Sequence, residues 1–136
     1  MIEWKEKKFS ELTTKELYEL SRIRSEIFVV EQKILYNHFD RKDYKAIHLS
    51  GFLEDRLTAY ARIFKEGDYY EANPGFGRVA VLEKERGKGY GKELVKKCVE
   101  VCRKNFKNKE IKISAQSYLE TFYEELGFEF RGERYM

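Results

Sequence analysis

Three glycines within five residues separate an apolar, β-forming run from an amphipathic helical stretch. The glycines lie in RGKGYG at residues 86–91, after an expected strand at 76–82 and before a helix that opens near residue 91. Glycine lets the backbone turn tightly and expose its N–H groups, and a helix N-terminus attracts anions. Arg86, Lys88 and Lys92 add positive charge. The segment therefore predicts a phosphate-binding loop, against the plainer alternative of a flexible turn before a helix.

The glycine spacing separates this loop from two familiar phosphate-binding motifs. A dinucleotide fingerprint needs G-x-G-x-x-G, but here the third glycine, Gly91, comes one residue early. A P-loop needs Ser or Thr after its lysine, whereas Glu93 follows Lys92. The pattern Arg-x-x-Gly-x-Gly, formed by Arg86, Gly89 and Gly91, resembles instead the acetyl-CoA pyrophosphate loop of the GNAT N-acetyltransferases.

Length and composition predict one soluble domain over residues 1–136. The chain has 42% hydrophobic and 38% charged residues, and no apolar run approaches the roughly 20 residues of a membrane span. The first residues lack the apolar core of a signal peptide, so we expect a cytoplasmic protein without a membrane partner. The net charge of +3 comes from 27 basic and 24 acidic residues that are interleaved, which argues against nucleic acid. Cys98 and Cys102 share a helical face, so we expect core positions and no metal site.

Hydrophobic periodicity orders the elements along the chain. Residues 2–5 alternate as a strand does, and a capping box at 13–16 predicts a helix from Thr14 into the late twenties. The remaining expected elements are a loop or short helix at 37–45, a hairpin of 46–54 with 57–65, the strand at 76–82, a helix ending near 106, a strand at 111–115, a helix at 119–126 and a final strand from 128. This order predicts an α/β (α+β) fold with a mixed central sheet flanked by helices.

The same order resembles the GNAT fold over nearly the whole chain. Members of that superfamily usually finish with a hairpin, whereas this chain ends at Met136, about one strand short by its sequence pattern. An uncapped sheet edge pairs readily with another chain. The apparently shortened C-terminus therefore makes a homodimer an expectation.

The resemblance implies that acetyl-CoA is the co-substrate and that no metal is required. The pantetheine arm would pair with a strand backbone as an added strand does, and the pyrophosphate would lie on the glycine loop. From the residues alone, 79–81 is simply a buried strand. The implied coenzyme-binding residues are Val79, Ala80, Val81, Arg86, Gly87, Lys88, Gly89, Tyr90, Gly91 and Lys92.

A second motif supplies a candidate acid. The run Phe-Tyr-x-x-Leu-Gly-Phe at 122–128 is similar to the GNAT segment whose tyrosine faces the coenzyme sulfur, which is Tyr123 here. A phenol with a pKa near ~10 stays protonated at neutral pH and can donate to a departing thiolate. The alternative is a core aromatic, because Tyr123 lies on an apolar helical stripe.

A third motif narrows the resemblance to one branch of the superfamily. Arg24 to Gln32 reads Arg-x-x-x-Phe-Val-Val-Glu-Gln, which resembles the signature of the ElaA-like branch of the superfamily. Arg24 falls on the apolar helix face, so it needs an acidic partner or a place at the rim of the acceptor cleft. The candidate substrate residues are Arg24, Glu31, His48 and Gln116. The candidate bases are Glu31, His48, Asp40 and Asp43, with an ordered water as the alternative.

We therefore expect an N-acetyltransferase that moves the acetyl group of acetyl-CoA to a primary amine of a small-molecule or peptide acceptor. The amine would attack the thioester directly, without a covalent enzyme intermediate. Two other functions stay open. One is a non-catalytic acyl-CoA-binding or regulatory module, and the other is an acyltransferase like the acyl-homoserine lactone synthases.

Overall fold

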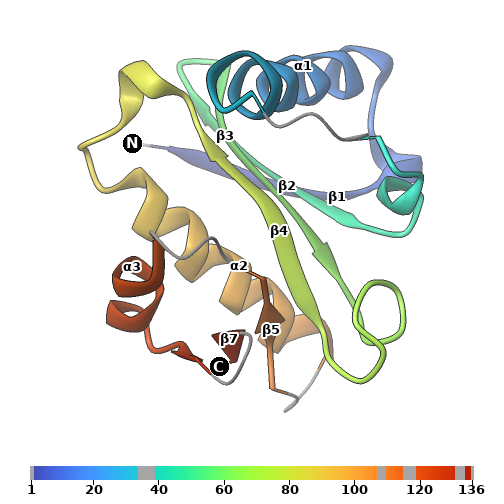
Figure 1. Cartoon of the computed structure of the whole chain (residues 1–136). Helices are drawn as coiled ribbons and strands as arrows, with labels where there is room; N and C mark the ends of the chain where they lie inside the picture. Colours follow the sequence, from blue (N-terminus) through green and yellow to red (C-terminus); the bar gives the residue numbers. More distant parts are fainter. Residues whose placement is uncertain (1, 34–38, 107–109, 115–118, 131–133, 136) are drawn as a thin grey trace.

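The computed structural model describes residues 2–33, 39–106, 110–114, 119–130 and 134–135. Its strands form one mixed sheet in the order β1-β2-β3-β4-β5-β7-β6, in which β4 and β5 are parallel and the other neighbours antiparallel (Figure 1). The strands are β1 (Glu3–Lys8), β2 (Ile47–Leu53), β3 (Arg56–Phe64), β4 (Gly75–Val81), β5 (Lys112–Ile113), β6 (Glu129–Phe130) and β7 (Arg134–Tyr135).

Helices cover both faces of this sheet. The α1 helix lies on one face, and α2 and α3 lie on the other (Figure 1). The helical elements are η1 (Phe9–Glu11), α1 (Thr14–Arg24), the π-helix η2 (Ser25–Glu31), η3 (Lys42–Tyr44), η4 (Glu83–Glu85), α2 (Tyr90–Phe106) and α3 (Glu120–Glu125). The predicted mixed sheet between helices is confirmed, and the segment predicted as a loop or short helix contains the single turn η3.

Local signals explain where α1 begins and how it ends. The predicted capping box is present, because Glu16 N donates to Thr13 Oγ1 (3.1 Å) and Thr13 N donates to Glu16 Oε1 (2.8 Å). After Arg24 the helix widens into η2, where Gln32 N donates to the carbonyl of Ile27 five residues earlier (2.9 Å). Such π segments occur mostly at functional sites, because the extra residue per turn redirects side chains.

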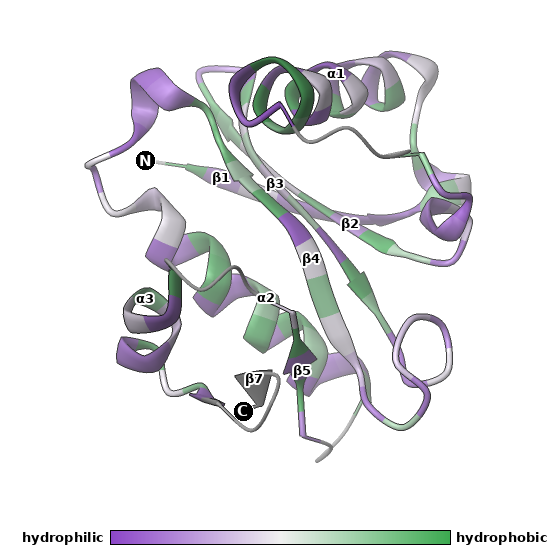
Figure 2. Ribbon diagram, viewed as in Figure 1, coloured by the Kyte–Doolittle hydropathy of each residue, from purple (hydrophilic) through white to green (hydrophobic). Residues whose placement is uncertain are grey.

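Two apolar clusters hold the helices on the sheet. Leu20, Ile23 and Ile27 pack against Tyr60 and Ala80 on the α1 face. On the other face α2, whose ribbon alternates hydrophobic and hydrophilic patches in Figure 2, packs its buried side onto β3 and β4. As predicted, both cysteines of α2 are core residues. Burial raises the pKa of the Cys98 thiol and raises that of Cys102 to about 12, so neither is a reactive thiolate at neutral pH.

The C-terminus corrects one expectation. The chain does form the closing hairpin, since β6 and β7 pair antiparallel and β7 lies between β5 and β6. The prediction that the chain ends one strand short was wrong. The final strand predicted from 128 is β6, and the strand that was missed is β7, which is only two residues long and therefore too short for an alternating pattern to be visible in the sequence. The expectation of a homodimer rested on the missing strand and loses that support.

The sheet opens between its two parallel strands. Among the described residues, Gly75 and Lys112 are the only register pair between β4 and β5, and Lys112 N donates to the carbonyl of Pro74 (2.9 Å). A Cβ on Gly75 would stand 2.3 Å from the Lys112 carbonyl oxygen, so only glycine permits this approach. Beyond that point β4 has no strand partner on this side among the described residues, and we call this stretch its open edge.

A bulge lies next to that open edge. Arg78 adopts a φ of 52°, and the β3–β4 register shifts between Tyr60 and Arg62. Non-glycine residues seldom take positive φ, and a bulge re-aims the residues that follow it. The bulge therefore sets the direction in which Val79 and its neighbours face the opening.

Candidate active site

A cleft of about 420 Å³ lies along the open edge of β4. It gathers residues from η2, β4, the glycine loop, the start of α2, and α3, although these elements are far apart in the sequence. The lining residues are Ile27, Gln32, Val79, Ala80, Val81, Arg86, Gly87, Gly89, Gly91, Lys92, Leu119, Phe122 and Tyr123. Most predicted coenzyme-binding residues and the predicted acid thus share one cleft, whereas Lys88 and Tyr90 are not among its lining residues.

The glycine loop places the N-terminus of α2 beside this cleft. Gly87 and Gly89 have φ values of 82° and 83°, which disfavour any side chain. The first turn of α2 closes when Glu93 N donates to the Gly89 carbonyl (3.1 Å), so the preceding N–H groups lie outside the regular helix. Gly91 differs, because a Cβ there would meet the Phe122 ring at an ordinary 3.7 Å. The turn therefore requires the first two glycines.

The cations around the loop are already paired with carboxylates. Arg86 makes a two-pronged ion pair with Glu31, at 2.5 Å from Nη1 to Oε2 and 2.9 Å from Nη2 to Oε1. The other pairs are Lys88 with Glu85 (3.3 Å) and Lys92 with Glu125 (3.6 Å). The sequence predicted free positive charge at this loop, and the structure places a carboxylate beside each cation.

Tyr123 lies both in the core and along the cleft. Its side chain is buried, and its ring makes edge-to-face contacts with Phe122 (5.1 Å between centroids) and Phe128 (5.7 Å). It is therefore a packed core aromatic that also lines the cleft. Such packing fixes the direction of the phenol, which an acid at a defined sulfur position needs.

Arg24 has the acidic partner that its apolar position requires. Its Nη1 lies 2.8 Å from Asp43 Oδ1, and its side chain is fully buried. Asp43 Oδ1 also accepts from Arg62 Nη1 (3.2 Å), and Arg62 makes two further bonds to Asp40 (2.8 and 2.9 Å). The result is a largely buried network in which Arg24 and Arg62 share Asp43, and Arg62 and Arg78 share Asp40. Arg24 is thus part of an ion-pair network.

His48 is held within the same network. Its Nε2 lies 2.9 Å from the Asp43 carbonyl, which can only accept, so Nε2 carries the proton. Its Nδ1 then accepts from the Tyr60 hydroxyl (2.6 Å). Burial lowers the pKa of His48, which keeps the imidazole neutral. Both ring nitrogens are occupied, so His48 does not have the free nitrogen that a general base needs.

The three carboxylates among the candidate bases also have charged partners. Asp43 binds two arginines, Glu31 binds Arg86, and Asp40 binds Arg62. Burial opposes ionisation of Asp40, but the hydrogen bonds and charge of Arg62 outweigh it and hold the pKa of Asp40 well below its usual 3.8. Each of the four predicted bases is therefore held by hydrogen bonds or ion pairs to neighbouring residues.

The low pKa of Asp40 predicts how stability depends on pH. A carboxyl with a lower pKa in the folded chain contributes its full stabilisation above the unfolded value near 3.8, and this stabilisation is lost progressively as the pH falls below that value toward the lower pKa of the folded chain. We expect urea unfolding to show a larger loss of stability between pH 7 and pH 3 in the wild type than in Asp40→Asn. Equal losses in the two proteins would contradict the assignment.

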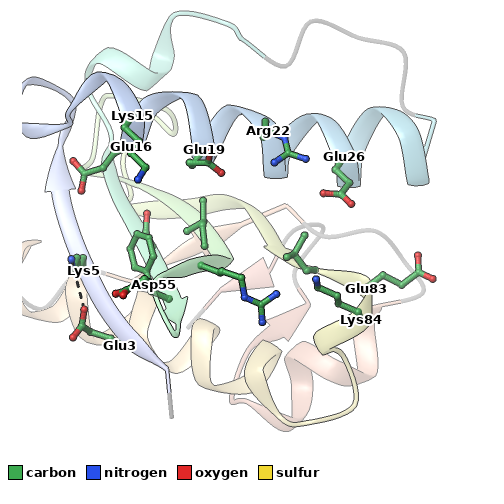
Figure 3. Close-up of a pocket in the computed structure, with 15 residues that line it drawn as sticks. Glu3, Lys5, Lys15, Glu16, Glu19, Arg22, Glu26, Asp55, Glu83 and Lys84 are labelled. Carbon is green, nitrogen blue, oxygen red and sulfur yellow. Dashed lines mark ion pairs between the residues drawn. The ribbon is translucent and has the colours of Figure 1, made fainter.

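A larger groove lies elsewhere, between α1 and the sheet, with a volume of about 950 Å³ (Figure 3). Side chains of both signs line it, and Glu3 and Lys5 pair across 3.7 Å. Its charged residues are Glu3, Lys5, Lys15, Glu16, Glu19, Arg22, Glu26, Asp55, Arg56, Glu83 and Lys84. It lacks the glycine loop and Tyr123, so chemistry rather than volume selects the smaller cleft.

Comparison with solved structures defines the class of protein. An acyl-CoA N-acyltransferase from Pseudomonas aeruginosa superposes with a TM-score of 0.89 at 30% identity, covering 100% of this chain and 98% of the other. ElaA from Escherichia coli superposes with a TM-score of 0.88 at 37% identity, covering 99% and 97%. The sheet that opens beside β4 and the glycine-rich helix start are therefore those of an acyltransferase.

The chain belongs to the GNAT acetyltransferase family, whose domain model matches residues 15–136. Within that family it is similar to ElaA. The Escherichia coli K12 protein is 39% identical over 130 residues, which span 94% of this chain and 84% of ElaA.

Some site residues were not singled out from the sequence. Ile27 and Gln32 line the cleft, and Arg62 joins the buried network. For Arg62 the available sequence signal was the presence of an arginine in a strand that is otherwise mostly apolar. Gln116, a candidate substrate residue, lies outside the described residues. Within the described residues there is no group of three or more metal-ligating side chains and no helix suited to crossing a membrane.

Proposed function

We propose that this protein transfers the acetyl group of acetyl-CoA to a primary amine of a small-molecule or peptide acceptor. The observation that carries the proposal is the shared cleft, in which the open β4 edge, the glycine loop and Tyr123 lie together. Membership of the GNAT family supports an acyl-CoA donor. Family membership identifies the chain as an acyltransferase. We propose in addition the nature of the acceptor and the roles of the individual residues.

The cleft suits the two halves of the coenzyme. The pyrophosphate would accept hydrogen bonds from the N–H groups before α2, where the helix dipole adds favourable charge. The pantetheine arm carries amide groups, and it would lie along Val79 to Val81 as an added strand. The thioester would then lie near the β4 bulge, within the part of the cleft that Tyr123 lines.

The reaction balances without a further reactant. The amine nitrogen attacks the thioester carbonyl carbon, a C–N bond forms and the C–S bond breaks. Tyr123 donates its proton to the departing thiolate, which leaves as coenzyme A, and the tyrosine phenolate then takes a proton back from water. The amine loses its extra proton to water, because the predicted bases Glu31, His48, Asp40 and Asp43 are engaged in the contacts described above.

Direct attack is favoured over a covalent enzyme intermediate. Among the described residues that line the cleft there is no cysteine, serine or threonine. Both cysteines are buried in α2 with raised thiol pKa values. An acyl-enzyme would need an accessible nucleophile activated by a neighbouring base.

Coenzyme binding is tested by thermal unfolding. Acetyl-CoA at ~100 times its Kd is expected to stabilise the folded protein by about 2.7 kcal/mol. Gly89→Ala should abolish most of this effect, because alanine is strained at a φ of 83°. Gly67→Ala is the matched control, since Gly67 also has positive φ (91°) with open space but lies outside the cleft. Absence of any stabilisation in the wild type would overturn the proposed function.

Turnover is tested separately, by thiol release from acetyl-CoA with a panel of primary amines. Release that requires the amine, with N-acetylated product detected by mass spectrometry, supports the transferase. Tight coenzyme binding without release for any amine would favour the non-catalytic acyl-CoA-binding module instead.

A further inference from the structure

Two motifs that are 55 residues apart meet at the mouth of the cleft. Glu31 stands at the end of η2, and Arg86 stands before the glycine loop. Both carboxylate oxygens of Glu31 are used, at 2.5 and 2.9 Å from the two terminal nitrogens of Arg86. Two parallel bonds fix the orientation of a guanidinium as well as its position. Arg86 is therefore aligned although its side chain is 40% exposed.

The third nitrogen of Arg86 acts on β4. Its Nε donates to the Val81 carbonyl oxygen at 3.0 Å. The next amide, Leu82 N–H, donates to Thr58 O on the β3 side (2.9 Å). Because the C=O and N–H of one planar trans peptide point in opposite directions, the Val81 carbonyl faces the open edge. Arg86 thus occupies the last carbonyl of the edge along which the coenzyme arm would pair.

We propose that Glu31 is a positioning residue that acts through Arg86 to set where the pantetheine arm leaves the β4 edge. This inference rests on the proposed function. A ligand that pairs along β4 must turn away at Val81, because the guanidinium blocks further pairing there. That turn leads directly to the glycine loop, whose N–H groups would receive the pyrophosphate. Glu31 also neutralises the charge of Arg86. The backbone N–H groups of the glycine loop, rather than this side chain, would therefore attract the pyrophosphate.

The two alternative roles of the Glu31–Arg86 pair predict different changes in the Kd values of two ligands. If the Glu31–Arg86 pair sets the register of the arm, its loss weakens binding only of ligands that carry pantetheine. If the pair instead tunes charge near the phosphates, its loss changes binding of every ligand that carries the pyrophosphate. Coenzyme A and adenosine 3′-phosphate 5′-diphosphate, which is coenzyme A without its arm, separate these cases.

The experiment measures both Kd values by calorimetry for the wild type and Glu31→Gln. We expect about tenfold weaker binding of coenzyme A, in line with the loss of a charge-assisted hydrogen bond. We expect less than a twofold change for the ligand without the arm. Glu125→Gln is the matched control, because Glu125 pairs with Lys92 at the same cleft but through an exposed contact of 3.6 Å. It should leave both Kd values unchanged.

Arg86→Met tests whether Glu31 acts through its partner. In that background Glu31→Gln should have no further effect on coenzyme A. An equal change for the two ligands, no change for coenzyme A, or a full additional effect without Arg86 would each overturn the inference. A wild-type protein that binds neither ligand would instead overturn the proposed function, and the inference with it.

Discussion

Replacing Tyr123 with phenylalanine is expected to lower kcat by about 10²–10⁴ while coenzyme A binds with nearly unchanged Kd. In the proposed mechanism the phenol supplies the proton that the departing thiolate takes, and phenylalanine keeps the ring without that proton. The edge-to-face contacts with Phe122 and Phe128 involve only the ring, so the fold and the cleft wall should persist. Steady-state kinetics with acetyl-CoA and an active amine, beside calorimetry with coenzyme A, measure the two effects separately.

A matched control for this variant is Tyr18→Phe, since the Tyr18 side chain is exposed on α1 and lies outside the cleft. Its kcat should equal that of the wild type. A Tyr123→Phe protein with kcat within about twofold of the wild type would remove the tyrosine from the mechanism, and water would then have to protonate the thiolate.

Replacing Asp43 with asparagine is expected to lower the free energy of unfolding by about 3–5 kcal/mol. Asp43 Oδ1 lies within hydrogen-bond distance of both Arg24 and Arg62, whose side chains are 0% and 1% exposed. The variant removes the carboxylate charge that faces both buried guanidinium groups, and buried charge with less compensation is costly. Urea unfolding at pH 7 measures the change.

Asp55→Asn is the control for this loss, because Asp55 is exposed in the β2–β3 turn and asparagine tolerates its φ of 67°. We expect its effect to stay within about 0.5 kcal/mol. If Asp43→Asn cost no more than this control, the network would not be important for stability.

The sequence predicted the sheet and its helices because each rests on a local pattern, and the family resemblance predicted which residues of β4 and the glycine loop share one cleft. The capping box at Thr13, the two residues between β2 and β3, and the glycines at 87 and 89 all act over a few residues. The motif around Tyr123 placed that residue on the right helix. These signals do not depend on which distant segment becomes a neighbour.

The sequence does not show which residues far apart in the chain contact each other in the fold. Nothing local says that Glu31 meets Arg86, or that Asp43 bridges Arg24 and Arg62. Those contacts depend on how η2 and η3 pack over the sheet. The final strand predicted from 128 corresponds to β6, whereas β7 was missed because its pairing with β5 and β6, rather than any alternation, defines it.

The single register pair between β4 and β5 has a consequence for cooperativity. Strands β1 to β4 are joined by long antiparallel ladders, whereas the seam to β5 at Gly75 is one pair long. Such a seam separates regions that open with different free energies, so amides of β5 should exchange with solvent sooner than those of β3. A coenzyme lying in the opening would bridge the two regions, and ligand binding and the folding of the C-terminal part would then be a single equilibrium.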